Sequence, residues 1–284
     1  MKAQLVGILH PGEMGISIAA SAKNSGCDVY WASQGRSAST RERVAKVGLH
    51  EAATVAELCG KCGIVISVCP PHAAEDVANE VIRSGFRGLF VDANAIAPQR
   101  TEKIAEAMTK ADVAFVDGGI IGFPAWKPHT TCLYLSGPRS DEAALCFSAG
   151  PLDTKVLGDQ IGKASALKMC YAANTKGTVA LLAAIVATAE NLGVREALFE
   201  QWKHDDPALP GQVEKRIQAN APKAWRFVGE MEEISRTFHA AGTPGEFHAG
   251  AADIYARLAR FKDAKTPPAL EDILAALTEG VNIK

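Results

Sequence analysis

The stretch from Leu5 to Gly15, LVGILHPGEMG, decides the fold. Its apolar first half predicts a buried parallel strand, and Pro11-Gly12 predict a break before a helix of small residues over 14–24. This order places a glycine-containing turn directly before a helix N-terminus, where free backbone N–H groups and the helix dipole attract a diphosphate. The stretch therefore predicts a dinucleotide-binding unit at the start of the chain.

The turn departs from the usual GxGxxG fingerprint at its first position. His10 takes the place of the first glycine, while Gly12 and Gly15 hold the second and third places. Gly12 would let the backbone approach a pyrophosphate, and Gly15 would let the helix pack closely on the strand. We expect the turn to contact the cofactor through His10, Pro11, Gly12, Met14 and Gly15.

The second predicted strand, over 27–32, is followed by a loop without an acidic residue. NAD-selective sites place Asp or Glu at the end of this strand, where it binds the adenosine ribose hydroxyls. Here the loop reads SQGRS from Ser33 to Ser37. Arg36 can offer a planar guanidinium to a 2′-phosphate, and the hydroxyls of Ser33 and Ser37 can donate to it. The loop predicts NADP(H) as the cofactor; a solvated loop arginine is the alternative interpretation.

Strands and helices continue to alternate along the first half of the chain. The strand over 63–69 ends at Pro70-Pro71, which places Val68, Cys69 and Pro70 at the carboxyl edge of the sheet, where ligands bind. Further strands and helices are predicted over 73–84, 89–92, 99–109, 113–117 and 131–136. This alternation predicts a doubly wound parallel sheet, the α/β Rossmann class.

The composition changes near Gly162. From Lys163 to Leu192 the chain has no proline and much alanine, and its helical pattern stops at Gly193. Helical patterns fill the remainder, over 213–221, 222–241 and 250–261. We therefore predict an NADP-binding Rossmann domain over 1–161 and an all-α domain for substrate binding and dimerisation over 162–284.

Composition excludes several classes of protein. The chain has 284 residues, of which 48% are hydrophobic and 22% charged, as is usual for a globular protein. Its net charge of −2 gives no basic surface for nucleic acid or an anionic membrane. No uninterrupted apolar run reaches about 18 residues, and the N-terminus does not resemble a signal peptide. We expect a cytoplasmic protein without nucleic-acid or membrane partners.

The seven cysteines are odd in number and scattered, which is typical of reduced cytosolic thiols. Cys59 and Cys62 form a CxxC, but a zinc site would need a second ligand pair, and no well-spaced Cys/His pair follows. The sequence therefore predicts no metal site.

The motifs together resemble the β-hydroxyacid dehydrogenase family, the group related to 3-hydroxyisobutyrate and 6-phosphogluconate dehydrogenases. The family's N-terminal pattern is close to GxGxMG, which Gly12, Met14 and Gly15 match. Its proline-containing loop, which lines the cofactor, corresponds to the segment 68–71. The resemblance covers the whole Rossmann half and continues into the long helix that begins at Lys163.

The resemblance also assigns substrate and catalytic segments. The family's D-x-S-T-x-x-P segment is matched in part by Asp92, Asn94 and Pro98, which implies that Asn94 contacts cofactor and substrate. Its D-A-P-V-S-G-G segment corresponds to 117–123, which implies substrate contacts at Ile121 and Gly122. Its G-x-x-x-x-x-K-x-x-N segment corresponds to 162–171. This places Lys168 at the catalytic lysine.

This chain departs from the family pattern in the carboxylate-binding positions as well as at His10. Asn94 and Ile121 each replace a serine, Tyr171 replaces an asparagine, and Glu232 stands where typical members carry a substrate-binding lysine. The helical half looks most like a divergent subgroup with a phosphogluconate-dehydrogenase-like C-terminal domain. Members of the family are generally dimers through their helical domains, which implies a homodimer here.

Lys168 suits proton transfer at a substrate oxygen. A lysine can serve as general acid and base once burial brings its pKa near the working pH, and the helix around Lys168 is markedly apolar. Tyr171 and Thr175 lie within about 60° of Lys168 on the helix wheel. We expect Tyr171 to orient Lys168 or the substrate oxygen, with Thr175 on the substrate side; core packing is the alternative role for Tyr171.

The acidic run near residue 232 has two interpretations. Glu230, Glu232 and Glu233 with Arg236 most simply form a solvated helix face, and Glu232 as a substrate contact is the alternative. For His248 we expect a surface position.

Taken together, the residues and the resemblance predict an NADP-dependent oxidoreductase that transfers hydride between the nicotinamide and a small hydroxy or carbonyl compound. Lys168 and Tyr171 are the predicted catalytic residues. Two alternatives stay open: an NADPH-dependent imine reductase, and a protein that binds NADPH without turnover.

Overall fold

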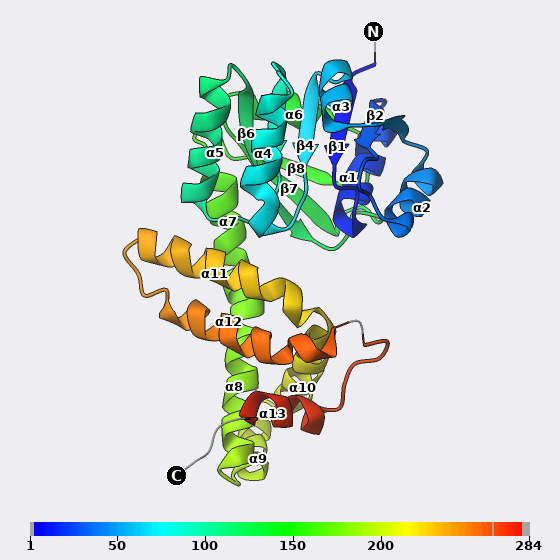
Figure 1. Ribbon diagram of the computed structural model, residues 1–284. Helices are drawn as coiled ribbons and strands as arrows, with labels where there is room; N and C mark the ends of the chain where they lie inside the picture. Colours follow the sequence, from blue (N-terminus) through cyan, green and yellow to red (C-terminus); the bar gives the residue numbers. More distant parts are fainter. Residues whose placement is uncertain (1–2, 263, 280–284) are drawn as a thin grey trace. The chain divides into compact units, whose positions relative to one another are not determined.

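The structure is a computed structural model that describes residues 3–262 and 264–279. The chain divides into two compact units, Met1–Met169 and Cys170–Lys284. The first unit contains all the strands of the described chain, and the second is helical (Figure 1).

The first unit is built on one eight-stranded sheet with the strand order β3-β2-β1-β4-β5-β6-β7-β8. Strands β1 to β6 are parallel throughout, so their carboxyl ends meet at one edge. The strands are β1 Leu5–Leu9, β2 Asp28–Ala32, β3 His50–Ala52, β4 Ile64–Ser67, β5 Leu89–Asp92, β6 Ala114–Gly122, β7 Thr131–Ser136 and β8 Asp153–Val156. The predicted doubly wound sheet is confirmed as a mostly parallel one.

The end of the sheet differs from the predicted all-parallel arrangement. Strand β7 runs antiparallel to β6, with Gly122 paired to Thr131, and β8 then runs parallel to β7. Only eight residues, 123–130, connect β6 to β7. A connection of that length can reverse the chain, whereas a parallel crossover needs a dozen residues or more.

Helices cover both faces of the sheet, which explains why its central strands are continuous apolar runs. Side chains of α1, α2 and α6 pack on one face, around Ile18 and Phe147. Side chains of α3, α4 and α5 pack on the other face, around Leu58 and Met108. These helices are α1 Glu13–Asn24, α2 Ala38–Val47, α3 Val55–Lys61, α4 Ala74–Arg83, α5 Pro98–Lys110 and α6 Ser140–Leu145, with the short turn η1 Pro71–Ala73.

The second unit is helical, as predicted. Helices α11 and α12 lie side by side (Figure 1), and their buried Ile234 and Tyr255 contribute to its core together with Val186 of α8 and Ile273 of α13. Its helices are α8 Thr178–Asn191, α9 Arg195–Asp205, α10 Leu209–Asn220, α11 Ala224–Ala240, α12 Glu246–Leu258 and α13 Leu270–Thr278, with the short turns η3 Ala221–Lys223 and η4 Ala259–Phe261.

A 29-residue helical segment, Lys163–Asn191, contains the predicted catalytic lysine. It consists of α7 Lys163–Ala172, a π-helical turn η2 Ala173–Gly177, and α8. By length and composition alone, this segment could cross a membrane, with a mean hydropathy of 1.3 in its most apolar window. Of that window, 44% is buried inside the structure. Core helices of soluble proteins meet the same criterion, so the segment is weak evidence for a span.

Candidate functional site

The turn after β1 leads directly into the N-terminus of α1. His10 adopts a left-handed conformation with φ 63°, and its carbonyl accepts a hydrogen bond from the Gly12 N–H at 2.7 Å. Helix α1 then begins at Glu13, and no side chain among the described residues caps it at Gly12. The first backbone N–H groups of α1 are therefore available to an anion.

The two glycines of the turn are required for different reasons. A Cβ on Gly15 would lie 2.5 Å from the His10 carbonyl oxygen, so only glycine lets α1 approach the turn this closely. A Cβ on Gly12 would meet nothing closer than that same oxygen, at 4.0 Å. Packing within the protein does not explain Gly12. The open space in front of it fits the backbone approach of a pyrophosphate.

The loop after β2 carries the three residues predicted to select the cofactor. Ser33 is buried, and its carbonyl accepts hydrogen bonds from the Arg36 N–H at 3.2 Å and from Arg41 Nη2 at 2.9 Å. Ser37 caps α2, where its hydroxyl accepts from the Thr40 N–H at 3.3 Å. Arg36 is half-buried, and its buried Nε has no hydrogen-bond partner among the residues that the structure describes.

The charge of Arg36 acts on His10 across the ends of the adjacent strands β1 and β2. Burial, with a smaller contribution from the Arg36 charge, lowers the pKa of His10 to about 4. Burial also lowers the pKa of Arg36, against the opposing effects of Glu80 and Cys69. The imidazole is therefore neutral at pH 7, and its buried Nδ1 has no partner within the described chain. This corner therefore holds the Arg36 cation, with Arg41 bound to the same loop, and two buried nitrogens without a partner among the described residues.

The segment Val68 to Pro70 follows β4 at the same edge. Asn94, which follows β5, fixes this segment: its Oδ1 accepts from the Cys69 N–H at 2.5 Å, and its Nδ2 donates to Ser67 Oγ at 3.1 Å. Asn94 is itself buried. Burial raises the pKa of Cys69 to about 12, so this residue is a thiol at neutral pH.

Asp117, in the middle of β6, anchors the helix that carries Lys168. Its carboxylate accepts hydrogen bonds from the N–H groups of Gly162 and Ser165, each at 3.0 Å, and from the Ser165 hydroxyl at 2.6 Å. The Ser136 hydroxyl donates to it at 3.0 Å. A negative charge at a helix N-terminus is favourable, and these bonds fix the start of α7. Burial raises the pKa of Asp117, and the bonds oppose that shift.

Gly119 sets the distance between α7 and the sheet. A Cβ at this position would lie 2.5 Å from the Ala164 carbonyl oxygen and 3.2 Å from Lys168 Cβ. The half-buried Lys168 thus rests against the backbone of β6. Ile121, two residues further along this strand, shares the sheet face of Gly119 because strand side chains alternate. Gly122, with φ 129°, ends β6 close to the Thr130 carbonyl, a conformation that favours glycine.

The other predicted site residues belong to the helical unit. Tyr171 is 46% exposed, and its carbonyl accepts a hydrogen bond from the Thr175 hydroxyl at 3.1 Å, at the π-helical turn. Glu232 is exposed and lies 3.8 Å from Arg236 Nη2. The predicted solvated face is wrong for two of its members, because Glu230 and Glu233 are buried in ion pairs with Lys176 and Arg236.

Sequence reasoning missed the polar cluster around Lys176. Lys176 forms an ion pair with Glu230 and lies 4.7 Å from the centre of the Phe227 ring, and its carbonyl accepts from the Tyr255 hydroxyl at 2.7 Å. The expected surface position of His248 is also wrong, since this ring is buried and packs on Phe238 with ring centres 4.5 Å apart. The signal that could have indicated the cluster was a lysine inside an otherwise apolar helical run.

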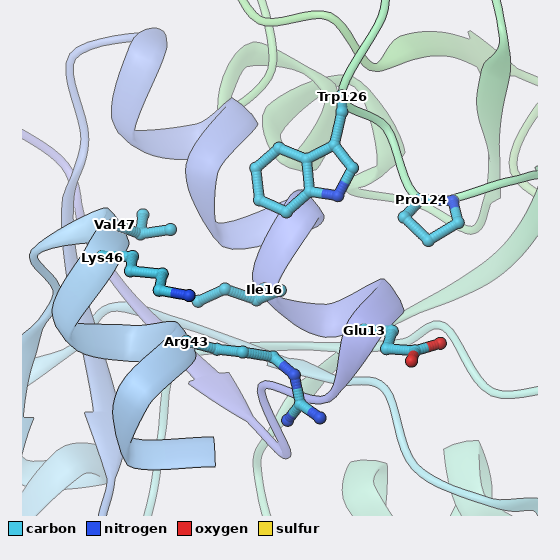
Figure 2. Close-up of a pocket in the computed structure, with 7 residues that line it drawn as sticks. All are labelled: Glu13, Ile16, Arg43, Lys46, Val47, Pro124 and Trp126. Carbon is cyan, nitrogen blue, oxygen red and sulfur yellow. The ribbon is translucent and has the colours of Figure 1, made fainter. Parts of the chain in front are cut away.

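A separate pocket of about 300 Å³ lies between α1, α2 and the loop after β6 (Figure 2). The indole of Trp126, which is 54% exposed, stands on one side, and the basic side chains of α2 stand opposite. The pocket is lined by Glu13, Ile16, Arg43, Lys46, Val47, Pro124 and Trp126. None of the residues predicted to bind cofactor or substrate is among them.

Comparison with known domain families agrees with this geometry. Residues 5–143 match the NAD binding domain of 6-phosphogluconate dehydrogenase, and residues 189–258 match a domain of unknown function, DUF1932. The two matches are consistent with a divergent β-hydroxyacid dehydrogenase-like family. The first match includes the turn at His10, the loop at Arg36 and the strand that carries Asp117.

Two individual proteins are similar to most of this chain. The chain is 29% identical over 195 residues to an uncharacterized 28.5 kDa protein of Methanothermus fervidus. The aligned region covers 69% of this chain and 74% of that protein. It resembles the conserved protein MTH1747, described as structurally similar to 3-hydroxyacid dehydrogenases, with a TM-score of 0.67, 27% identity, and coverage of 89% and 97% of the two chains.

A Mycobacterium tuberculosis 3-hydroxyisobutyrate dehydrogenase shares the fold, with a TM-score of 0.70, 16% identity, and coverage of 97% and 99%. The match to the NAD binding domain of 6-phosphogluconate dehydrogenase supports a pyridine-nucleotide oxidoreductase.

Proposed function

We propose that the protein is an NADP(H)-dependent oxidoreductase that acts on a small hydroxy or carbonyl compound, with Lys168 as its general acid and base. The proposal rests mainly on the region at the ends of β1 and β2, where His10 and Arg36 lie. There, Arg36 replaces the acid of NAD-selective enzymes, and the space in front of Gly12 is open.

The cofactor would be held by the carboxyl edge of the sheet. The N–H groups at the start of α1 would bind the pyrophosphate, and Arg36 would bind the 2′-phosphate with the hydroxyls beside it. The segment Val68 to Pro70, fixed by Asn94, would line the cofactor. When bound, the nicotinamide would supply or accept the hydride.

Lys168 would move the proton. Its ammonium donates to the carbonyl oxygen in reduction, and its neutral amine accepts the hydroxyl proton in oxidation. Because Lys168 rests on the glycine backbone of β6 and Asp117 fixes the start of its helix, its position is set by the sheet. Tyr171 would orient Lys168 or the substrate oxygen.

The substrate contacts proposed for this chain differ from those of typical family members. Ile121 shares the strand face of Gly119 and would present an apolar side chain where a serine usually helps hold the substrate carboxylate. An apolar side chain at that position disfavours a substrate carboxylate there, and Asn94, Gly122, Thr175 and Glu232 are the further candidate substrate contacts.

A substrate panel with matched lysine variants tests the proposal. The purified protein is assayed with NADPH or NADP against hydroxy acids, aldehydes, ketones and cyclic imines, alongside Lys168→Ala. We expect turnover of a hydroxy or carbonyl compound that falls about 10²- to 10⁴-fold in Lys168→Ala, with NADPH binding kept within about twofold. The control Lys163→Ala removes an exposed lysine of the same helix and should keep full activity.

Three outcomes of the panel would contradict the proposal. Undiminished turnover in Lys168→Ala would remove the role of this lysine. Activity confined to imines would establish the imine reductase alternative. Tight NADPH binding without turnover of any substrate class would favour the alternative of a protein that only binds the nucleotide.

We also propose that the protein forms a homodimer through its helical unit. Leu181 and Ile185 lie one turn apart on α8, Leu192 follows directly at the C-cap of this helix, and all three are exposed. Light scattering should give a dimer for the wild type and a monomer for Leu181→Arg. Leu145→Arg, on an exposed leucine of the first unit, should stay dimeric; a monomeric wild type would contradict the proposal.

We place the protein in the cytoplasm. All seven cysteines are free in the structure, which supports a reducing compartment.

A further inference from the structure

Histidine at position 10 lowers the stability of the fold in two ways. Its φ of 63° lies in the left-handed region, which a non-glycine residue enters at a cost and which typically marks a functional constraint. Its ring nitrogen Nδ1 is buried, and no described residue satisfies it. A glycine, the usual residue here, would avoid both costs. A function for the imidazole explains why the position carries histidine.

The neighbourhood of His10 indicates what the imidazole is for. The strands β1 and β2 are parallel neighbours, so the residues after them, His10 and Arg36, reach the same part of the sheet edge. Each presents a buried nitrogen, His10 Nδ1 and Arg36 Nε, that finds no hydrogen-bond partner in the described part of the chain. Two unsatisfied nitrogen groups beside a helix N-terminus are suited to an oxyanion with several acceptor oxygens.

We propose that His10 and Arg36 together receive the 2′-phosphate of NADP(H), and that His10 takes up a proton from solvent when this phosphate binds. The proton stays on the ring until the nucleotide leaves, and no bond of the nucleotide is made or broken. The inference rests on the proposed function, since it assigns His10 as a specificity-determining residue of that same cofactor site.

The charges around His10 explain the proton uptake. Without nucleotide, burial and the Arg36 cation hold the pKa of His10 at about 4, so the ring is neutral. The other groups that act on this corner are Glu80 of α4 and Cys69 of the loop after β4, which face Arg36, and Glu13 lies in the first turn of α1.

A bound phosphate monoester brings a charge of about −1.5 to −2 at pH 7, which opposes both the burial and the Arg36 charge that keep the ring neutral. An opposite charge within about 4–6 Å raises the pKa of a histidine, so we expect the His10 ring to take up a proton. The imidazolium and the bound phosphate then carry opposite charges. NADPH binding should therefore become tighter as the pH falls from 8 towards 6.5. NADH, which lacks the 2′-phosphate, should not show this dependence.

Binding and proton counting test the inference on the full-length protein. NADPH and NADH are titrated calorimetrically at pH 6.5, in buffers of different ionisation enthalpy, against the wild type, His10→Asn and His10→Gly. Asparagine and glycine both tolerate a positive φ, so these variants keep the turn. His50→Asn, on an exposed histidine of β3, is the control.

We expect His10→Asn to weaken NADPH binding about ten- to hundredfold, as for the loss of a hydrogen bond to a charged group, and to leave NADH within about twofold. The wild type should take up more protons per NADPH than either variant. The phosphate's own titration is common to all proteins, so the difference belongs to His10.

Two results would overturn the inference, and they are distinguishable. If the wild type prefers NADPH and both His10 variants keep that preference with the same proton count, His10 has no part in phosphate binding, while the proposed function stands. If the wild type binds neither nucleotide, the proposed function fails and this inference fails with it.

Discussion

Two regions of the first unit differ in whether their buried polar groups have hydrogen-bond partners. One is the corner where β6 meets α7, and the other is the corner where β1 and β2 end. At β6, the Asp117 carboxylate accepts hydrogen bonds from two backbone N–H groups and from the hydroxyls of Ser136 and Ser165. At β1 and β2, His10 Nδ1 and Arg36 Nε are buried without any partner among the described residues.

This difference distinguishes residues that position the helix of Lys168 from residues that we assign to binding the cofactor. A buried polar group that stays unsatisfied costs about 1–3 kcal/mol, so a ligand that supplies the missing partner recovers this free energy on binding. The Asp117 corner is complete within the protein and fixes the helix of Lys168. The His10 corner is incomplete, which is why we assign it to the cofactor.

The largest expected effect is on the free energy of unfolding, at Asp117, whose hydrogen bonds are all made within the protein. Asp117→Asn replaces an acceptor by an amide whose NH₂ group faces N–H and O–H donors. The variant should lose about 3–5 kcal/mol of unfolding free energy, as when a buried charged network loses one member. Urea unfolding measures this, with the exposed Asp159→Asn as the control. A loss below about 0.5 kcal/mol would show that the network does not anchor α7.

A pair of glycine variants sharpens the comparison at the binding corner. The Cβ of Gly12→Ala lies no closer than 4.0 Å to the His10 carbonyl oxygen, an ordinary contact, so this variant should unfold like the wild type. It should bind NADPH about a hundredfold more weakly, because its methyl group would occupy the proposed pyrophosphate position. Gly15→Ala clashes with the His10 carbonyl and should lose both stability and binding. Calorimetric binding and thermal melts measure the two properties separately. Unchanged NADPH binding in Gly12→Ala would contradict the assigned cradle.

Asp92 is intermediate between the two corners and gives the smallest of these effects. It pairs with Asp117 in register, and its Oδ1 accepts from the Asn94 N–H at 3.0 Å, while its buried Oδ2 has no described partner. Burial raises the pKa of Asp92 from 3.8 to about 7; the Asn94 N–H opposes this shift, and Asp117 adds to it.

The sign of the resulting pH dependence follows from this shift. Because the folded-state pKa lies above the unfolded one, the folded protein binds the extra proton, and stability is lost as the pH rises from about 4 to 7. Between pH 5 and pH 8, the wild type should lose roughly 2 kcal/mol of stability relative to Asp92→Asn. Parallel pH profiles of the two unfolding free energies would show that this carboxyl does not titrate in the window.

The sequence predicts the corner at the ends of β1 and β2 better than the corner where β6 meets α7. The order of an apolar run, a glycine turn and a small-residue helix was enough to place His10, Gly12 and Gly15, because local chemistry sets that geometry. The Asp117 network joins β6, β7 and the start of α7, which are distant in sequence. No periodicity reveals which hydroxyls meet a carboxylate across such distances.

The same limit explains the errors. The predicted strand ended at Asp117, whereas β6 continues to Gly122. The connection to β7 is therefore shorter than the sequence suggested, and a short connection reverses the chain. Glu230 and Glu233 fit a solvated helix face by spacing alone, but the helical unit buries both beside cationic partners. A sequence pattern shows that a helix has a polar face, and only packing shows what covers it.

The most direct test of the account is a fluorescence titration of the purified protein with NADPH and with NADH. NADPH should bind at least about tenfold more tightly than NADH. Arg36→Ala should abolish this preference, while Lys46→Ala, at an exposed cation of α2, should preserve it. Equal binding of the two nucleotides by the wild type, or an undiminished preference in Arg36→Ala, would contradict the account.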